Sequence, residues 1–326
     1  MMRSVTTSAL SLSALAATLV MLHGAPASAQ AAKTWVSHFG NDSLSCTSPA
    51  SPCLTFFGAL TKTAPGGEIG VVDAGDYGPV AISQPINITN DGAGEASVVN
   101  RSTVAITILA GVGDIVSLRG LVIDGQSGGT AGIFIGQASA VHIQSCVIRN
   151  FQDSGAGAGI LLRSGGQLFV SETIIFNNGS TAGTGGVLIQ PQGTASINVV
   201  LDRVHLENNV VGLQVSSTGG TASGAHVVIR DSVVSGNAGD GIQAVSAPGQ
   251  APAFIVVERT SVVNNAGTGI VAAGPHASVL LNDNTVARNA VGIAAGFGGQ
   301  LISYGNNKVN NNLGPDGVPT GSYSPI

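Results

Sequence analysis

Residues 227–242 read VVIRDSVVSGNAGDGI, and residues 256–270 read VVERTSVVNNAGTGI. In the first stretch an apolar residue, Ile229, is followed five positions later by Val234 and three positions after that by Asn237. The pattern recurs in copies that begin 23–31 residues apart, at Leu118, Ile143, Val170, Leu201, Ile229, Val257, Leu281 and Tyr304. A repeat with a period in the twenties is typical of solenoid proteins.

Each copy is predicted to hold three short strands and three corners. Val199 and Leu201 alternate with Val200 and therefore share one face of a strand, and a later strand in each copy opens with glycine, as at Gly212-Leu213. A unit of this size cannot bury its own apolar side, so the copies must stack with their strands in parallel. Parallel crossover connections are right-handed. We therefore predict an all-β fold, a right-handed parallel β-helix solenoid with a short N-terminal capping helix.

The asparagines of the repeat are predicted to form a column at one corner of the stack. Asparagine tolerates the left-handed backbone conformation that a sharp corner needs. In stacked coils the amide side chains can hydrogen-bond along the column. The column comprises Asn178, Asn209, Asn237, Asn265, Asn289 and Asn312.

The chain divides into four predicted segments. Residues 1–29 resemble a bacterial secretory signal peptide, with a basic start at Arg3, an apolar run and the small-residue sequence Ala27-Ser28-Ala29. Residues 30–66 are predicted to cap the solenoid, with a helix over 53–64 that Pro65-Gly66-Gly67 ends. The β-helix occupies residues 67–312, and residues 313–326 form a C-terminal tail. We expect Cys46 and Cys53 to pair in an oxidising, secreted or periplasmic location.

Charge excludes some classes of partner. Without Arg3, the expected mature chain has 11 basic and 17 acidic residues, a net charge of −6. Such a surface does not attract phosphate backbones, so we expect no nucleic-acid partner. No segment after residue 29 is apolar enough to span a membrane, and no cofactor motif or metal-ligand spacing is present.

The scarce charged residues alternate in sign from copy to copy. One position past the first apolar residue stand Asp202, Arg230, Glu258 and Asn282; two positions past it stand Glu172, Arg203, Asp231, Arg259 and Asp283. We interpret both columns as salt-bridge ladders rather than as a pair of catalytic carboxylates. The remaining candidates for an enzyme site are Arg119, Arg163, Glu172, Asp124 and Asp153. Cys146 is interpreted as a buried structural thiol.

One predicted surface is less ordinary. The residue before each first apolar position points outward and builds an apolar ridge, which comprises His142, Phe169, Val200, Val228, Val256 and Leu280. Gln167, Asn198, His226, Phe254 and Ser278 point the same way two positions earlier. An exposed apolar patch often marks a binding surface. Alternatively, the loops at 217–225 and 246–253 fold over it.

The repeats, together with the start HFGNDSLSCTSPASPCLTFFGALTKTAPGGEIGVVDAGDYG, resemble the bacterial right-handed β-helix proteins of the pectin-lyase-like superfamily. The resemblance implies the fold but no single activity. The acidic and basic motifs of its pectate lyases and polygalacturonases are absent from this sequence. We therefore predict a secreted, non-catalytic protein that presents an outer sheet face to a polysaccharide or a cell-surface macromolecule. The alternatives are a polysaccharide lyase or glycoside hydrolase, and self-association through the apolar ridge; the sequence leaves the oligomeric state open.

Overall fold

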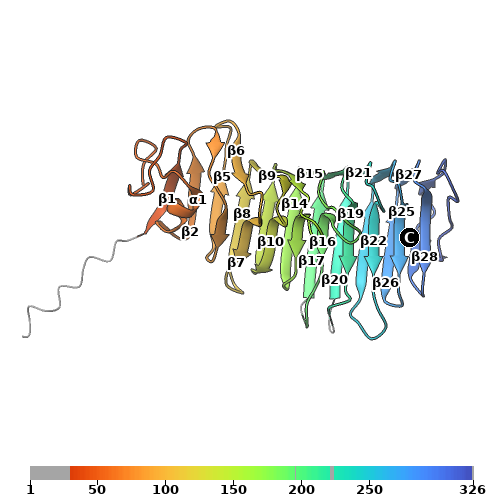
Figure 1. Cartoon of the computed structure of the whole chain (residues 1–326). Coiled ribbons are helices and arrows are strands. Elements are labelled where there is room, and N and C mark those ends of the chain that lie inside the picture. The colour runs from red at the N-terminus through yellow and green to blue at the C-terminus, as the bar shows by residue number, and fades with distance from the viewer. Residues whose placement is uncertain (1–29, 195, 221–223, 325–326) are drawn as a thin grey trace, which may run out of the picture. The chain divides into compact units, whose positions relative to one another are not determined.

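The computed structural model describes residues 30–194, 196–220 and 224–324, and the elements below lie within the unit Ala31–Ile326. The predicted signal peptide, residues 1–29, lies outside the described residues. Strands within this unit form three parallel sheets, and each full coil contributes one strand to each sheet in turn (Figure 1). Within the described residues, no helix has the length and hydrophobicity that a membrane crossing needs.

The first sheet contains the first apolar position of every repeat. Its twelve described strands are, in spatial order, β1 (Ala31–Val36), β2 (Thr63–Val71), β5 (Ile86–Thr89), β8 (Ile115–Arg119), β11 (Ala140–Gln144), β14 (Gly166–Ser171), β17 (Ser196–Asp202), β20 (Gly224–Arg230), β23 (Ala253–Glu258), β26 (Ala277–Asn282), β29 (Gln300–Ser303) and β31 (Gly321–Ser322). The chain then turns into the second sheet.

The second sheet carries the second apolar position of each repeat. Its ten described strands are β3 (Gly75–Asp76), β6 (Ala96–Val99), β9 (Leu121–Gly128), β12 (Val147–Phe151), β15 (Ile174–Phe176), β18 (His205–Glu207), β21 (Val233–Ser235), β24 (Ser261–Val263), β27 (Thr285–Ala287) and β30 (Lys308–Val309). The corner after this sheet holds the asparagines.

The third sheet begins after that corner. Its nine described strands are β4 (Val80–Ile82), β7 (Val104–Leu109), β10 (Ala131–Gln137), β13 (Ala158–Leu162), β16 (Gly185–Ile189), β19 (Val211–Ser216), β22 (Ile242–Val245), β25 (Thr268–Ala273) and β28 (Val291–Gly296). The chain then returns to the first sheet, one coil further along the stack.

The predicted register is confirmed through seven of the eight repeats. The first apolar residues from Leu118 to Leu281 pair in one row of the first sheet and are buried. The eighth is wrong, because Leu281 pairs with Ser303 rather than with Tyr304. Val286 nevertheless pairs with Val309. The last turn therefore holds one residue more than the others, and the Tyr304 ring lies 6.1 Å from that of Tyr323.

The asparagine column is confirmed as a buried hydrogen-bonded ladder. Asn237 Nδ2 donates to Asn265 Oδ1 at 2.7 Å, and the backbone N–H of Asn209 donates to Asn237 Oδ1 at 2.9 Å. The ladder ends on Asp316, whose Oδ1 accepts from Asn312 Nδ2 at 2.8 Å. A carboxylate therefore takes the place that the next asparagine would occupy.

The predicted conformation of the ladder asparagines is wrong. A positive φ is found one position earlier, for example 53° at Asn208 and 58° at Asn264, and not at Asn209 or Asn265. The preceding residue makes the corner. The ladder asparagine is instead required for its side chain, which satisfies buried backbone groups on the neighbouring coils.

The predicted N-terminal helix is much shorter than expected. Helix α1 covers only Phe56–Leu60, with Gly58 N donating to Thr55 Oγ1 at 2.9 Å as an N-cap. Thr63–Val71 is strand β2 and includes the Pro65-Gly66-Gly67 segment that was expected to end the helix. Pairing with β1 and β5 on either side outweighs the helical pattern there. Capping of the solenoid by this helix stays a prediction.

The expected disulfide between Cys46 and Cys53 is present, with Cα atoms 5.1 Å apart. The loop that it closes lies along β1, since Trp35 N donates to Cys46 O and Cys53 N donates to Trp35 O, both at 2.8 Å. An exposed edge strand invites pairing with another chain, and this loop occupies the edge. At the other end, β31 pairs with β29. The segment boundaries at residues 66 and 312 stay predictions.

Candidate functional site

The outer face of the first sheet carries two parallel rows of outward side chains. The register aligns His142, Phe169, Val200, Val228, Val256 and Leu280 in one row. It aligns Gln167, Asn198, His226, Phe254 and Ser278 in the second. His142, Asn198 and His226 are exposed, and the apolar members of the first row are half-buried. Both rows continue through five or more adjacent coils.

Two aromatic pairs stand on this face. The His142 and Phe169 rings are stacked, with centroids 4.8 Å apart and planes inclined by 11°. The His226 and Phe254 rings lie 5.9 Å apart at 56°. Between them lies a pocket of about 250 Å³, lined mainly by Phe169, Asn198, Val200, His226, Val228 and Phe254. The face is therefore an apolar platform with aromatic edges and one amide at its centre.

A second, larger hollow adjoins the platform at Asn198. It measures about 530 Å³ and is formed where the turns from the third sheet enter the first. Its polar lining residues are Gln137, Ser139, Ser164, Gln167, Ser196 and Asn198. Sequence reasoning found Gln167 and Asn198 but missed the others. The sequence does contain a pattern that could have predicted them, because serine and glutamine recur just before the first-sheet strand in consecutive copies.

The two loops that were considered as a cover pair with each other. The N–H of Ala251 donates to Gly220 O at 3.0 Å, and Ser217 Oγ donates to Ala251 O. Every residue lining the smaller pocket comes from β14, β17, β20 or β23. The described parts of the two loops therefore do not line this pocket, and His142, Asn198 and His226 on the same face are exposed.

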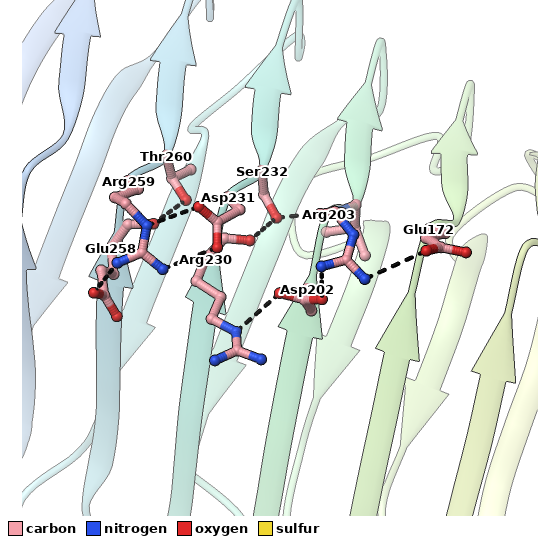
Figure 2. Close-up of polar contacts among 10 residues, drawn as sticks. Glu172, Asp202, Arg203, Arg230, Asp231, Ser232, Glu258, Arg259 and Thr260 are labelled. Carbon is pink, nitrogen blue, oxygen red and sulfur yellow. Dashed lines mark hydrogen bonds and ion pairs between the residues drawn. The ribbon is translucent and has the colours of Figure 1, made fainter.

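The charged columns form two clusters rather than two continuous ladders. Figure 2 shows the charged side chains side by side where first-sheet strands end. Asp202 accepts from Arg230 at 2.9 Å and from Arg203 at 2.7 Å, and Arg203 also reaches Glu172 at 3.3 Å. The second cluster comprises Asp231, Glu258 and Arg259 (Figure 2).

The predicted ladders are interrupted between these clusters. Arg259 holds Asp231 through two contacts of 2.8 and 2.9 Å, and the ion pair lowers the pKa of the Asp231 carboxyl. No ion pair among the described residues joins Arg230 to Glu258 or Arg203 to Asp231. Arg203 and Arg259 each contact a carboxylate in their own turn as well as one in the preceding coil, whereas Arg230 contacts Asp202 of the preceding coil. The carboxylates of both clusters are thus already paired with cations.

The five enzyme candidates are spread around the solenoid. Arg119 ends β8 and pairs with Asp91 at 3.4 Å, whereas Asp124 lies on the second sheet and pairs with Arg149 at 2.8 Å. Glu172 follows β14, Asp153 follows β12 and Arg163 follows β13, so these three belong to three different corners. The structure does not bring these residues together in one site.

A calcium-assisted site of the pectate-lyase type needs several carboxylate oxygens converging on one point. Among the described residues there is no group of three or more histidine, cysteine, aspartate or glutamate side chains that could hold a metal ion. The carboxylates of Asp202 and Glu258, at the strand ends beside the platform, already contact arginines.

Cys146 is buried beside the turn after β11, and its Sγ contacts the carbonyl oxygen of Gln144 at 3.3 Å. Burial raises the pKa of this thiol to about 11, and a thiol is nucleophilic only as thiolate. We expect no reaction with an aromatic disulfide reagent at pH 8 in the folded protein, and complete reaction in 8 M urea. Rapid labelling of the folded protein would contradict a purely structural role.

Comparison with known proteins agrees with this geometry. The family model described as "Right handed beta helix region" matches residues 97–313. The chain therefore belongs to the right-handed β-helix family, and the predicted right-handed parallel β-helix is confirmed. A search of curated proteins finds no match.

Several solved structures are similar to this chain, each with a TM-score below 0.5. Pectate lyase Pel9A is 14% identical, with 86% of this chain and 79% of that chain covered and a TM-score of 0.48. The A-module of mannuronan C-5 epimerase AlgE4 from Azotobacter vinelandii is 16% identical, with 80% and 90% covered and a TM-score of 0.40. The GH136 lacto-N-biosidase from Eubacterium ramulus is 10% identical, with 90% and 67% covered and a TM-score of 0.44. These likenesses concern the fold alone.

Proposed function

We propose that this protein binds a glycan on the outer face of the first sheet and does not cleave it. The observation that carries the proposal is the platform, on which two aromatic pairs flank Asn198. Flat aromatic rings offer rigid apolar area to the C–H faces of sugars. Binding sites combine such area with a few polar groups that fix orientation, and the adjoining hollow supplies hydroxyls and amides.

The arrangement of the carboxylates supports binding without cleavage. A polysaccharide lyase or glycoside hydrolase is the alternative, and a glycosidase needs two carboxyl groups about 5–10 Å apart in one groove. Neither of the two hollows at the platform includes an aspartate or glutamate in its lining. A third hollow, where β5 and β8 end, is lined by one carboxylate, that of Asp91, which pairs with Arg119 at 3.4 Å. The carboxylates at the neighbouring strand ends are held by arginines. Catalysis would require breaking those pairs.

The proposal includes export from the cytoplasm. Residues 1–29 have the pattern of a signal peptide, and the Cys46–Cys53 disulfide suits an oxidising compartment. A polysaccharide or cell-surface partner would be met in such a compartment. Mass spectrometry of the protein recovered from the periplasm or medium should give a mature chain that begins at Gln30.

A glycan array and a depolymerisation assay on residues 30–326 test the function. We expect binding to at least one glycan with no rise in absorbance at 235 nm, the signal of lyase products. Phe169→Ala and Phe254→Ala should each weaken binding about tenfold, because each removes an aromatic face worth about 1 kcal/mol or more. Phe297→Ala, which alters an exposed ring in the turn after β28, should bind as the wild type does. Product release would favour the enzyme instead.

The competing hypothesis is that the platform is exposed in one chain because it binds a second copy of the protein. Light scattering on the wild type and on Phe169→Asp and Val228→Asp separates the two. A wild-type dimer that both variants dissociate would identify a second copy as the occupant. A wild-type monomer whose mass the variants leave unchanged removes that explanation and leaves the platform free for a glycan.

A further inference from the structure

We infer that the ligand of the platform is an uncharged oligosaccharide that lies along the solenoid axis, and not a uronate polymer. This inference rests on the proposed function and specifies its ligand class. Four properties of the face support this inference. Its two rows of outward side chains carry no charged residue, and the arginines nearest to it already contact other side chains. Amide and hydroxyl side chains of the adjoining hollow have no hydrogen-bond partner among the described residues, and the two aromatic pairs lie several strands apart.

The two outward rows carry no aspartate, glutamate, lysine or arginine from β11 to β26. Their residues are apolar, aromatic, amide, hydroxyl or histidine side chains. The same holds for the described lining of both hollows. A uronate polymer brings one carboxylate per sugar, and burying an ionised carboxylate without a counter-charge is costly. The platform offers no such counter-charge.

The cations at the rim of the platform already have partners. Arg230 Nε contacts Asp202 at 2.9 Å, and Arg119 contacts Asp91 at 3.4 Å. Arg163 donates to Gln190 at 3.5 Å and does not line either hollow. At Arg230 and at Arg119, a bound carboxylate would have to displace a protein carboxylate from its arginine. The surplus of acidic over basic residues in the whole chain adds a general repulsion of polyanions.

The polar groups of the larger hollow are free to bind hydroxyl groups. Among the described residues, none hydrogen-bonds the side chains of Gln137, Ser139, Gln167, Ser196 or Asn198. This differs from the ladder, where every amide is satisfied by its neighbours. Amides and hydroxyls both donate and accept hydrogen bonds, and so do the hydroxyls of a neutral sugar. The polar side chains of the hollow therefore suit a neutral sugar in their hydrogen-bonding chemistry as well as in their position beside the platform.

The spacing of the aromatic pairs indicates a ligand of several sugar units. Phe169 on β14 and Phe254 on β23 are separated by three strand spacings along the sheet, about 14 Å at about 4.8 Å each. A single sugar ring is too small to touch both. A chain that runs along the axis would contact Phe169, Asn198 and Phe254 in turn.

Affinity electrophoresis at 20 mM and 500 mM NaCl tests the ligand class. The gels contain galactomannan, xyloglucan, mixed-linkage β-glucan, polygalacturonate or alginate. We expect retardation by at least one of the three neutral polymers, equal at both salt concentrations, and none by the two polyuronates. Asn198→Ala should weaken retardation at least tenfold. Asn87→Ala, an exposed asparagine on β5 of the same sheet, should leave retardation unchanged.

The outcomes separate this inference from the function on which it rests. Retardation by a polyuronate that disappears in 500 mM NaCl and in Phe169→Ala would overturn the neutral ligand while keeping glycan binding on the platform. Retardation by none of the polymers, together with an empty glycan array, would remove the proposed function and this inference with it. If a neutral polymer retards the protein, fragments of two and of five sugars prepared from that polymer can be tested as competitors. Equal competition by the two fragments would overturn the inference that the ligand extends over several sugar units.

Discussion

Gly212→Ala is expected to lower the free energy of unfolding by about 3 kcal/mol, the upper end of the cost of overpacking a well-packed core. A Cβ atom at this position would lie 2.6 Å from the carbonyl oxygen of Gly241 and 2.7 Å from Val234 Cγ1. The first of these atoms is backbone of the next coil and cannot rotate away. It would also lie 3.1 Å from Asn237 Nδ2. The next coil must therefore shift, which strains the asparagine ladder.

Gly296→Ala provides the matched control. Gly296 also belongs to the third sheet, its φ is not in the left-handed region, and a Cβ there would meet no atom within 4 Å. It should be neutral or stabilise by about 0.4–1 kcal/mol, because alanine restricts the unfolded chain. Urea denaturation followed by circular dichroism gives both values. Equal losses in the two variants would show that the close approach at Gly212 is not the cause.

The stack of coils was predictable because its requirements repeat. Parallel pairing of identical units needs the same apolar position in every copy, so the period could be read from residues such as Ile229 and Val257. The prediction from the period was wrong at Tyr304, because the last turn holds one extra residue. A pattern of apolar residues cannot show on which side of such an insertion the strand ends. Only the pairing of β29 with β26 decides that.

Local conformations and side-chain partners were harder to predict. The helical pattern over residues 53–64 was correct only for Phe56–Leu60, because β2 gains two neighbouring strands. The alternating charges suggested continuous ladders, but a guanidinium can pair with a carboxylate in its own turn or with one in the preceding coil. The polar hollow at Asn198 depends on how three turns lie against each other. Such choices depend on distances that one sequence does not contain.

Asn237→Asp is expected to cost about 4 kcal/mol or more at pH 7. Asn237 is buried, and its Nδ2 donates to Asn265 Oδ1 at 2.7 Å and to Leu206 O at 3.2 Å. An ionised carboxylate would turn an acceptor toward both of these oxygens. Burial and the lost hydrogen bonds favour the neutral form, and raise the pKa of a buried carboxyl by about 3 units or more. Each unit corresponds to about 1.4 kcal/mol.

The pH dependence of this loss distinguishes a buried charge from a general packing defect. The carboxyl at residue 237 has a raised pKa when folded and a value of about 3.9 when unfolded. The unfolded state therefore loses its proton first, and the variant loses stability as the pH rises from about 4 toward the folded pKa. Near pH 4 the protonated carboxyl still donates to Asn265, so most of the difference from wild type should vanish. Asn310→Asp, an exposed position next to the same corner, should match the wild type at both pH values. A loss at position 237 that stays the same from pH 4 to pH 7 would mean that the ladder acts through shape alone and not through its donors.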